Sequence, residues 1–429
     1  MTYEQALEFI HGIPRFGKKP GLRRIQNLLS RMGNPQDTLS FIHVAGTNGK
    51  GSTCAMLSSI LRESGYRTGL YISPFVIEFR ERMQINGEMI PKDMLCEITS
   101  EVQNHWLAMQ AEGEPPSEFE VVVSIAFEFF RRQKCDIVVL EVGMGGRLDS
   151  TNVISASLIS VIASIGLDHM EYLGNTLDKI AAEKCGILKP GGVCVSAPEQ
   201  DPLAIDVIRK RCAEENNPLF VPGDAQIISE GIEGSRIRYR DLDVFIPLTG
   251  SHQIKNALTV IEVCKALELT SFSVSNDIII SGIAKTTFPC RMERFGNNPL
   301  IIIDGAHNTP GATALAEALT HLRGRRIHAL MGISPDKDSE GIMSAVLPLC
   351  ESVVISAARG VKASPPEVLE KPAQKYISSI TCSPNSERAL KLALSKCSGD
   401  DVLLVFGSLY FAGEIRGQLT MYNEQCTMN

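Results

Sequence analysis

A glycine-rich stretch between an apolar run and a helix-like segment is the feature that most constrains this chain. It reads His43-Val44-Ala45-Gly46-Thr47-Asn48-Gly49-Lys50-Gly51-Ser52-Thr53, and the helix-like segment continues to Ser64. Glycines let the backbone turn sharply and approach a ligand, so that amide N–H groups and a helix N-terminus can face phosphates. Lys50 would add positive charge at the outer phosphates, and the Ser52 or Thr53 hydroxyl could reach magnesium. We therefore predict a phosphate-binding loop (P-loop).

The stretch departs from the common P-loop pattern at two places. Val44 stands at the first glycine position, and Gly51 separates Lys50 from the two hydroxyls. A motor protein or GTPase would normally have Gly-Lys-Ser or Gly-Lys-Thr. The alternative is a turn between a strand and a helix that binds nothing. The order of strand, loop and helix favours phosphate binding.

Length and composition narrow the possibilities. A chain of 429 residues exceeds one ordinary core, so we expect two domains, conceivably three. Lysine and arginine number 42 against 49 aspartates and glutamates, a net charge of −7 without long blocks of one sign. We therefore expect no nucleic-acid partner. The 12 cysteines form no CxxC pair and lie beside no histidine cluster, which argues against a zinc site and a disulfide framework.

Targeting signals are also missing from the pattern. The residues from Met1 to Gln5 lack the basic and apolar regions of a signal peptide. The most apolar long stretch, Val153 to Leu167, contains several serines and falls short of the roughly 20 residues needed to cross a bilayer. We expect a cytoplasmic protein with reduced thiols and no membrane attachment. No long apolar helix demands a partner, so we expect a monomer.

Two series of alternating strands and helices are predicted. In the first, strands are expected at Phe41 to Ala45, Thr68 to Ile72, Asp136 to Glu141 and Ala156 to Ile165. A segment rich in proline, glycine and charge, Phe288 to Pro299, precedes a second series from Leu300 to Phe406. This order predicts an α/β fold. We expect a P-loop domain with a parallel sheet over residues 1–290, a hinge over 291–299 and a smaller Rossmann-like domain over 300–429.

Polar residues follow several of the predicted strands, where ligands bind in open parallel sheets. Glu141 ends a buried strand and is a candidate magnesium ligand, although it could instead cap backbone amides. Asp168 and His169 end another strand, and such a histidine is either a site residue or a structural hydrogen bonder. Asp304 to Asn308 and Gly407 to Tyr410 end strands beyond the hinge. A reaction in a cleft between domains would suit activation of an acid as an acyl phosphate and its capture by an amine.

The chain resembles the folylpolyglutamate synthase and dihydrofolate synthase family of the Mur ligase superfamily. The resemblance spans nearly the whole length and rests on motifs in the family's order: Gly21 to Ile25, Gly46 to Thr53, Ser73-Pro74, Glu141 to Asn152, Leu167 to His169, Glu183 to Ile187, His252-Gln253 with Asn256, Arg291, Asp304 to Asn308, and Gly407-Ser408. It implies a ligase that uses ATP and Mg²⁺ to join L-glutamate to a folate through an acyl phosphate. The acid is the γ-carboxylate of a folyl glutamate or polyglutamate, or the carboxylate of dihydropteroate.

The resemblance also implies roles for individual residues. It places ATP on Thr47, Asn48, Gly49, Lys50, Gly51, Ser52, Asn256, Arg291 and Asp304, and magnesium on Ser73, Glu141 and His169. Lys184 falls on the lysine that the family carries as a carbamate (N6-carboxylysine), a form in which CO₂ turns a neutral amine into an oxygen ligand. Glutamate binding and catalysis fall on His307 and Ser408, and the catalytic set is Lys50, Lys184, Asp304 and His307. Folate contacts fall on Phe119, Glu120, Leu148, Asp149 and Ser150.

Three positions depart from the family pattern. Cys290 replaces the glycine usual before the hinge arginine, Phe75 stands where a histidine often follows Ser-Pro, and Thr309 displaces the usual proline by one position. Each lies in a loop, so the departures bear on substrate detail more than on the reaction. Two alternatives stay open. One is another amide ligase of the superfamily, which would more often carry a further nucleotide-binding domain before Phe41; the other is a nucleotide-dependent switch without ligase activity.

Overall fold

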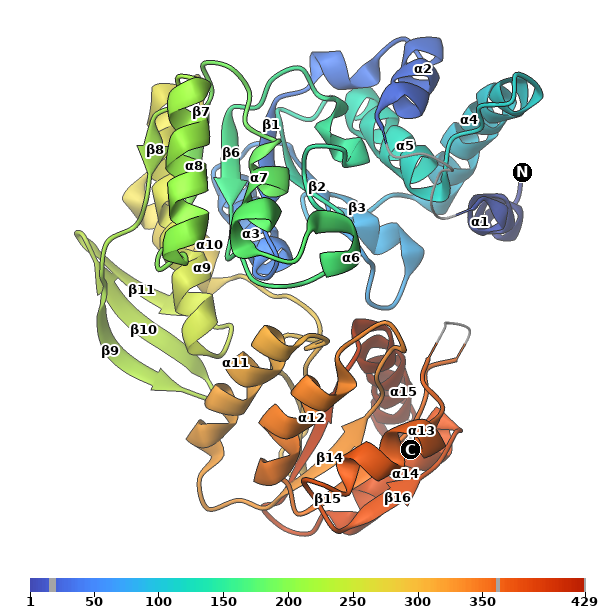
Figure 1. The fold of residues 1–429 in the computed structure, drawn as a ribbon, viewed down its shortest axis with the longest axis vertical. Helices are drawn as coiled ribbons and strands as arrows, with labels where there is room; N and C mark the ends of the chain where they lie inside the picture. The colour runs from blue at the N-terminus through green and yellow to red at the C-terminus, as the bar shows by residue number, and fades with distance from the viewer. Residues whose placement is uncertain (15–20, 360–362, 428–429) are drawn as a thin grey trace.

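The computed structural model describes residues 1–14, 21–359 and 363–427. Its first part is built on an eight-stranded sheet with the order β4-β3-β2-β5-β1-β6-β7-β8 (Figure 1). The strands are β1 (Phe41–Ala45), β2 (Thr68–Tyr71), β3 (Met83–Ile85), β4 (Glu88–Met89), β5 (Ile137–Glu141), β6 (Ile159–Ile162), β7 (Val193–Ser196) and β8 (Leu219–Phe220). From β2 to β8 the pairs are parallel, and β3 and β4 add an antiparallel hairpin at one edge. The hairpin turns at Asn86-Gly87, a strong hairpin signal.

Helices cover both faces of this sheet, and for this reason every residue of β1 and β5 is buried and most of these residues are apolar. One face carries α1 (Tyr3–Gly12), α2 (Arg23–Arg31), α4 (Lys92–Ala111) and α5 (Glu118–Arg132). The other carries α3 (Lys50–Glu63), α9 (Ser251–Ala266) and α10 (Asn276–Ala284). A third cluster joins α7 (Leu177–Cys185) and α8 (Pro202–Glu214) beside β7, with the short α6 (Met170–Leu173) next to them.

A three-stranded antiparallel sheet extends from this part toward the second. Its strands are β9 (Gln226–Gly231), β10 (Gly234–Tyr239) and β11 (Leu242–Ile246), with the order β11-β10-β9. Figure 1 shows it at the left, reaching down beside α11. The buried side chains of β10 and β11 alternate with exposed ones, because one face packs on α9 and α10 while the other faces solvent.

The second part is a six-stranded sheet with the order β12-β13-β17-β14-β15-β16. Its strands are β12 (Glu293–Phe295), β13 (Leu300–Ile303), β14 (Ile327–Met331), β15 (Ser352–Ile355), β16 (Ile380–Cys382) and β17 (Val402–Phe406). All pairs are parallel except β12 with β13. The helices are α11 (Thr309–Leu319), α12 (Ser339–Val346), α13 (Pro366–Ala373), α14 (Ser386–Lys396) and α15 (Leu409–Thr427). The α/β fold with parallel sheets is therefore confirmed.

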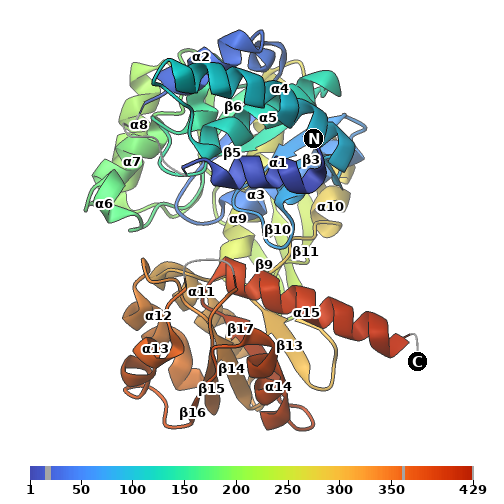
Figure 2. The same cartoon turned by 90° about the vertical axis from the view of Figure 1, so that its right-hand side faces the viewer.

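Three local features differ from the sequence prediction. The sequence Gly250-Ser251 favours a serine N-cap for α9, but Gly250 caps that helix with φ +109°, and the Ser251 hydroxyl donates to Glu317. The segment expected to be a hinge, residues 291–299, contains strand β12, which pairs with β13. The long final helix α15, prominent in Figure 2, was not predicted.

A loop of the first part packs against the second. The loop runs from Ser73 to the 3₁₀ helix η2 (Phe79–Arg82) and, in Figure 1, descends toward α15. Val76 belongs to the same buried cluster as Phe411 and Ile415 of α15. A side chain at Gly413 would collide with the Val76 carbonyl oxygen, so glycine lets the two backbones meet. None of the described helices is long and apolar enough to span a bilayer, and the described cysteines are free thiols.

Candidate active site

The P-loop joins β1 to α3 and is held in place by the strand beside it. The amide groups of Thr47 and Asn48 donate to the Ser164 carbonyl oxygen at 2.8 and 3.2 Å, just after β6. Gly49 caps α3 at φ +83°, and a Cβ there would lie 2.4 Å from Asn256 Oδ1. Asn256 on α9 therefore lies directly against the loop. Ser52 is buried in the first turn of α3, and its hydroxyl oxygen accepts a hydrogen bond from Gln253 of α9.

Two lysines converge on this loop. Lys50 Nζ donates to the carbonyl oxygens of Gly46 and Thr47, and Lys184 Nζ from α7 donates to the same Gly46 oxygen at 2.8 Å. Lys184 is 3% exposed, so its amine is buried near the end of α7. Burial, together with the nearby Lys50 charge, lowers the pKa of Lys184 to about 7. A large share of this amine is neutral near pH 7.

A buried carboxylate lies on the other side of the loop. Glu141 ends β5, and its Oε2 accepts the Ser73 backbone N–H at 3.0 Å. Burial raises the pKa of Glu141, and Lys50 and Arg291 oppose that rise because both positive charges lie nearby. Glu141 Oε1 accepts no hydrogen bond from the residues that the structure describes. One carboxylate oxygen is thus anchored and the other is available to a ligand.

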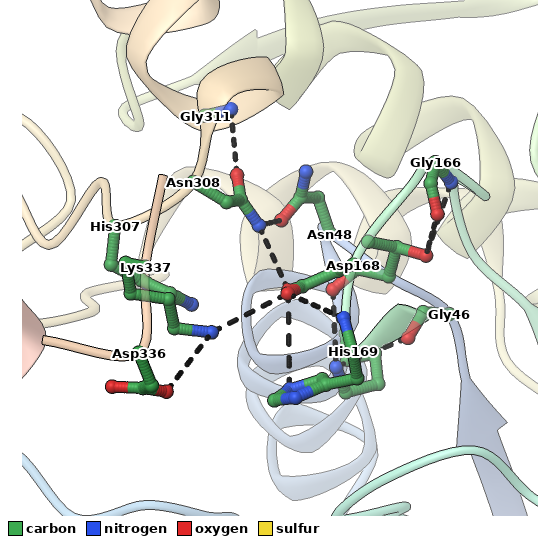
Figure 3. A network of polar contacts seen from close by, with 12 residues as sticks. Gly46, Asn48, Gly166, Asp168, His169, His307, Asn308, Gly311, Asp336 and Lys337 are labelled. Atoms are coloured by element: carbon green, nitrogen blue, oxygen red, sulfur yellow. Dashed lines mark hydrogen bonds and ion pairs between the residues drawn. The ribbon is translucent and has the colours of Figure 1, made fainter. Parts of the chain in front are cut away.

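Asp168 forms a polar network between the two parts of the chain (Figure 3). Its carboxylate accepts from Asn308 Nδ2 at 3.1 Å and from Lys337 Nζ at 3.4 Å, both beyond β13. Asn308 also donates to Asn48 Oδ1 of the P-loop and caps α11 through Gly311 N–H. Burial would raise the pKa of Asp168, but His169, Lys337 and Asn308 together lower it to about 2. The network therefore ties the P-loop to the second sheet.

His169 stands at the edge of that network. Its φ of +48° places it in the left-handed region before α6, and its Nε2 lies 4.0 Å from Asp168 Oδ2. Burial lowers the pKa of His169, Asp168 raises it, and three nearby lysines lower it further, two of which are Lys50 and Lys184. The His169 ring is therefore close enough to Lys50 and Lys184 for their charges to affect its pKa.

Residues after β13 complete the site from the second part. The Asp304 carboxylate accepts the Met292 N–H on Oδ2, which holds the segment that follows Arg291, and the Ala306 N–H on Oδ1, which holds its own loop. The Arg291 guanidinium lies over the Phe288 ring at 5.7 Å. His307 Nδ1 lies 2.9 Å from the Gly305 carbonyl oxygen, and burial lowers the pKa of His307 to about 4, which keeps the ring neutral. Ser408 lines a small pocket with Ile333 and Phe411.

The predicted folate residues are only partly gathered. Phe119 and Asp149 meet at Gly143, where an added Cβ would lie 2.5 Å from the ring and 3.1 Å from Asp149 Oδ2. The Asp149 oxygens accept from the amides of Met144 and Thr151 and from the Thr151 hydroxyl. Glu120 is engaged by Ser117 in the capping box of α5 and by Arg24. Its carboxylate is therefore committed to structure. Ser150 is buried, whereas Leu148 is exposed.

The donors near the P-loop fit a hard divalent cation. Ser73 and Glu141 lie together and supply oxygen, which Mg²⁺ prefers. Among the described residues, no three histidine, cysteine, aspartate or glutamate side chains gather into a metal cluster. A site with few protein ligands suits Mg²⁺ in nucleotide enzymes, where phosphate oxygens and water complete the coordination.

Comparison with known proteins identifies the family. The Mur ligase middle domain matches residues 44–264, and the Mur ligase glutamate ligase domain matches residues 290–409. A Bacillus subtilis dihydrofolate synthase/folylpolyglutamate synthase is 35% identical over 430 residues, covering 97% of this chain and 99% of that protein. The chain belongs to the folylpolyglutamate synthase and dihydrofolate synthase family. It is an ATP-dependent ligase.

Two further relatives agree with the ligase assignment. Lacticaseibacillus casei folylpolyglutamate synthase is 32% identical, and the match covers 98% of this chain and 99% of that one. The structure of Mycobacterium tuberculosis folylpolyglutamate synthase complexed with ADP is 29% identical and has a TM-score of 0.89, covering 97% and 98% of the two chains. The fold of this chain, over nearly its whole length, therefore has a counterpart in a solved member of the family.

Sequence reasoning missed two residues of the site. Asn308 was noted only as part of a motif, although the following Thr-Pro-Gly is the signature of a helix start with an asparagine cap. Lys337 was not singled out, because Asp336-Lys337-Asp338 resembles a solvated charged turn. Its 13% exposed side chain reaches a carboxylate 169 residues earlier in the chain. No local signal announces that contact.

Proposed function

We propose that this ligase joins L-glutamate to the γ-carboxyl group of a tetrahydrofolyl glutamate or polyglutamate. An oxygen of the γ-carboxylate attacks the γ-phosphorus of ATP, ADP leaves, and an acyl phosphate forms. The amine of L-glutamate then attacks the acyl carbon, the amide bond forms, and phosphate and a proton leave. The observation that supports this proposal best is the pair of lysines on Gly46, one of them buried with a pKa near 7.

The P-loop residues Thr47 to Ser52 would hold the phosphates, with backbone N–H groups and the N-terminus of α3 facing the negative charge. Lys50 would turn from its carbonyl partners to the outer phosphates when they are present. Asn256 already lies against the loop, and Arg291 lies at the hinge near Glu141, so we assign both to ATP. Asp304 would shape the ATP site from behind, because its Oδ2 holds the backbone next to Arg291 and its Oδ1 holds the loop at Ala306.

We assign magnesium to Ser73, Glu141 and His169. Mg²⁺, when bound, would neutralise charge on the transferring phosphoryl group. Lys184 would act as its carbamate, since a buried neutral amine reacts with CO₂ while an ammonium does not. The product carries a negative charge that Lys50 can balance. The L. casei and B. subtilis relatives carry the names of ligases with this reaction, which is consistent with these roles.

We assign the acceptor to Phe119, Glu120, Leu148, Asp149 and Ser150. Of these, Phe119 offers an aromatic face to the acceptor. Asp149 would position the backbone at Met144 beside that ring, and Glu120 would position the start of helix α5. His307 and Ser408 would meet the incoming glutamate from the second domain. A neutral His307 can accept a proton from the glutamate amine.

We further propose domain limits of 1–290, a hinge at 291–299 and a glutamate ligase domain at 300–429, in a monomer of the cytoplasm. Dihydropteroate is a second acceptor candidate, because the B. subtilis relative carries both names. The test is ADP release with ATP, magnesium and L-glutamate, comparing tetrahydrofolate, dihydropteroate and no acceptor, with products weighed by mass spectrometry. One added glutamyl unit on tetrahydrofolate supports the proposal, gain on both acceptors indicates a bifunctional enzyme, and glutamate-independent ADP release contradicts it.

A further inference from the structure

A buried arginine beside the site lacks a charged partner. Arg82 ends η2, is 8% exposed, and its buried Nε has no hydrogen-bond partner among the residues that the structure describes. Its guanidinium lies over two rings, 5.3 Å from the centroid of Phe75 and 5.6 Å from that of Phe79. Aromatic faces attract a cation but accept no N–H in the guanidinium plane. The in-plane Nε–H of Arg82 is therefore free for an anion.

Other arginines of the first part of the chain have carboxylate partners. Arg80, two residues earlier, pairs with Glu78 and donates to the Ile90 carbonyl oxygen. Arg24 pairs with Glu120, and Arg132 pairs with Glu128. A buried cation without a carboxylate partner destabilises the fold, because nothing offsets the free energy lost when the charge leaves water. A bound ligand with a negative charge would offset that loss.

A second orphaned group lies next to Arg82. The Tyr71 hydroxyl is buried and has no hydrogen-bond partner in the structure. Tyr71 is close to Arg82 because β2 pairs with β3, where Tyr71 lies opposite Met83 and the Ile72 N–H donates to the Arg82 carbonyl oxygen. A phenol beside a guanidinium offers O–H and N–H donors together. Such a pair matches the two oxygens of a carboxylate.

The cluster lies between the candidate acceptor residues and the second domain. The Tyr71 ring contacts the Phe119 ring edge-on at 6.4 Å, and Phe119 is the proposed folate contact. The Phe75 ring contacts Tyr410 at 6.3 Å, and Tyr410 follows Ser408 by two residues. Ser73, the candidate magnesium ligand, lies between Tyr71 and Phe75 in the chain. An anion bound here would lie beside the reacting end of the acceptor.

We propose that Arg82, with Tyr71, binds the α-carboxylate of the terminal glutamyl residue of the acceptor. The inference rests on the proposed function, in which the γ-carboxylate of that residue is the group activated. The α-carboxylate does not react, and it needs a cation to hold the residue in place. Dihydropteroate ends in a single benzoate carboxylate and has no such group. Arg82 therefore favours folyl glutamates as acceptors and contributes nothing to the binding of dihydropteroate.

The experiment compares two acceptors on each enzyme preparation. One is tetrahydrofolate, and the other is tetrahydropteroyl-4-aminobutyrate, which keeps the terminal carboxylate and lacks the α-carboxylate. The measured quantity is the ratio of their kcat/KM values. In the wild type, tetrahydrofolate should be favoured roughly 10- to 100-fold, the scale of one charged hydrogen bond. In Arg82→Gln the ratio should fall to within about threefold of one, because the variant loses only what the α-carboxylate gained.

The ratio separates binding from folding, since both acceptors see the same fraction of folded enzyme. Arg80→Gln is the matched control, two residues away with its own carboxylate partner, and should keep the wild-type ratio. Arg82→Lys should give an intermediate ratio, because a point charge remains without the planar fork. An Arg82→Gln ratio equal to that of the wild type would overturn the proposal. So would a wild type that uses both acceptors equally.

Two other outcomes are distinguishable. If Arg82→Gln raises the KM of L-glutamate and leaves the acceptor ratio unchanged, Arg82 meets the incoming amino acid and the proposal is wrong. If the wild type releases no ADP in a glutamate-dependent way with tetrahydrofolate, the proposed function itself fails. The acceptor ratio is then replaced by direct binding of the two pteroyl compounds to wild type and Arg82→Gln. Equal affinity of the wild type for both compounds would overturn the role of Arg82 independently.

Discussion

Lys50 and Lys184 donate to the same carbonyl oxygen, that of Gly46. Burial is the main reason that the pKa of Lys184 is lowered to about 7, and the nearby charge of Lys50 lowers it further. Both effects favour the neutral amine, the form that our proposed reaction with CO₂ requires.

The pH dependence of this modification follows from that pKa. Below about pH 7 the Lys184 ammonium predominates and cannot be carbamylated; above it the neutral amine is available. We expect ¹³C-labelled bicarbonate to give a carbamate signal in NMR spectra that grows as pH rises through about 7. Lys184→Arg, which stays charged, should lack the signal. A signal that persists in this variant would place the carbamate on another lysine.

Removal of the Lys184 side chain should nearly abolish the reaction. We expect Lys184→Ala to lower kcat by roughly 100-fold or more, the scale for loss of a group that stabilises charge in a closed site. Acetate or another short carboxylic acid should restore part of the activity, because it can occupy the space of the carbamate. Steady-state ADP release with and without the acid checks this. Wild-type turnover without added acid would refute a carbamate role.

The charge of Glu141 should set the magnesium requirement. Glu141→Gln keeps the shape of the side chain and removes one negative charge. We therefore expect the magnesium concentration for half-maximal activity to rise roughly 10- to 100-fold, the scale for altering groups around a metal. Glu128→Gln, a buried carboxylate paired with Arg131 and Arg132 on α5, serves as the control. An unchanged magnesium titration in Glu141→Gln would remove it from the metal site.

The Asp168 network should hold the domains together. In Asp168→Asn the charged contact with Lys337 is lost, which costs about 1.5–3 kcal/mol. We expect a larger radius of gyration in small-angle scattering and a higher KM for ATP, because Asn308 also contacts Asn48. Asp336→Asn is the control, since Asp336 is largely exposed and lies 4.0 Å from Lys337. Identical scattering from wild type and Asp168→Asn would contradict the prediction.

The same network has a defined pH window. Because the pKa of Asp168 is lowered to about 2, the folded state binds this proton less readily than the unfolded chain does. Its contribution to stability is complete above about pH 4, the ordinary range of aspartate, and is lost as pH falls toward 2. Domain association should therefore survive mild acid.

The sequence predicted those features that leave a local pattern. The apolar runs of β1 and β5 indicated central strands, and the glycines at 46 and 49 indicated the P-loop that follows β1. Family motifs then indicated Lys184, which the structure buries beside that loop. These signals are short-range, so one chain was enough to read them.

Features made by distant contacts could not be predicted in this way. Lys337 meets Asp168 only after two domains pack, and Gly250 rather than Ser251 caps α9 because glycine adopts a positive φ there. Arg82 resembled any charged residue before a hairpin until the fold placed it over two rings. Asp304, assigned to ATP by resemblance, is occupied by backbone amides that no motif reveals.

Val76 gives the two domains a shared mechanical element. It lies in the loop after Ser73, yet its side chain is buried with residues of α15. A rotation of the second domain must either carry this loop with it or leave an apolar side chain in water. The Ser73 amide that holds Glu141 is three residues away, at the root of the same loop. We therefore expect movement of the second domain to move this loop and, through the Ser73 N–H, to change the distance between the Glu141 carboxylate and the P-loop.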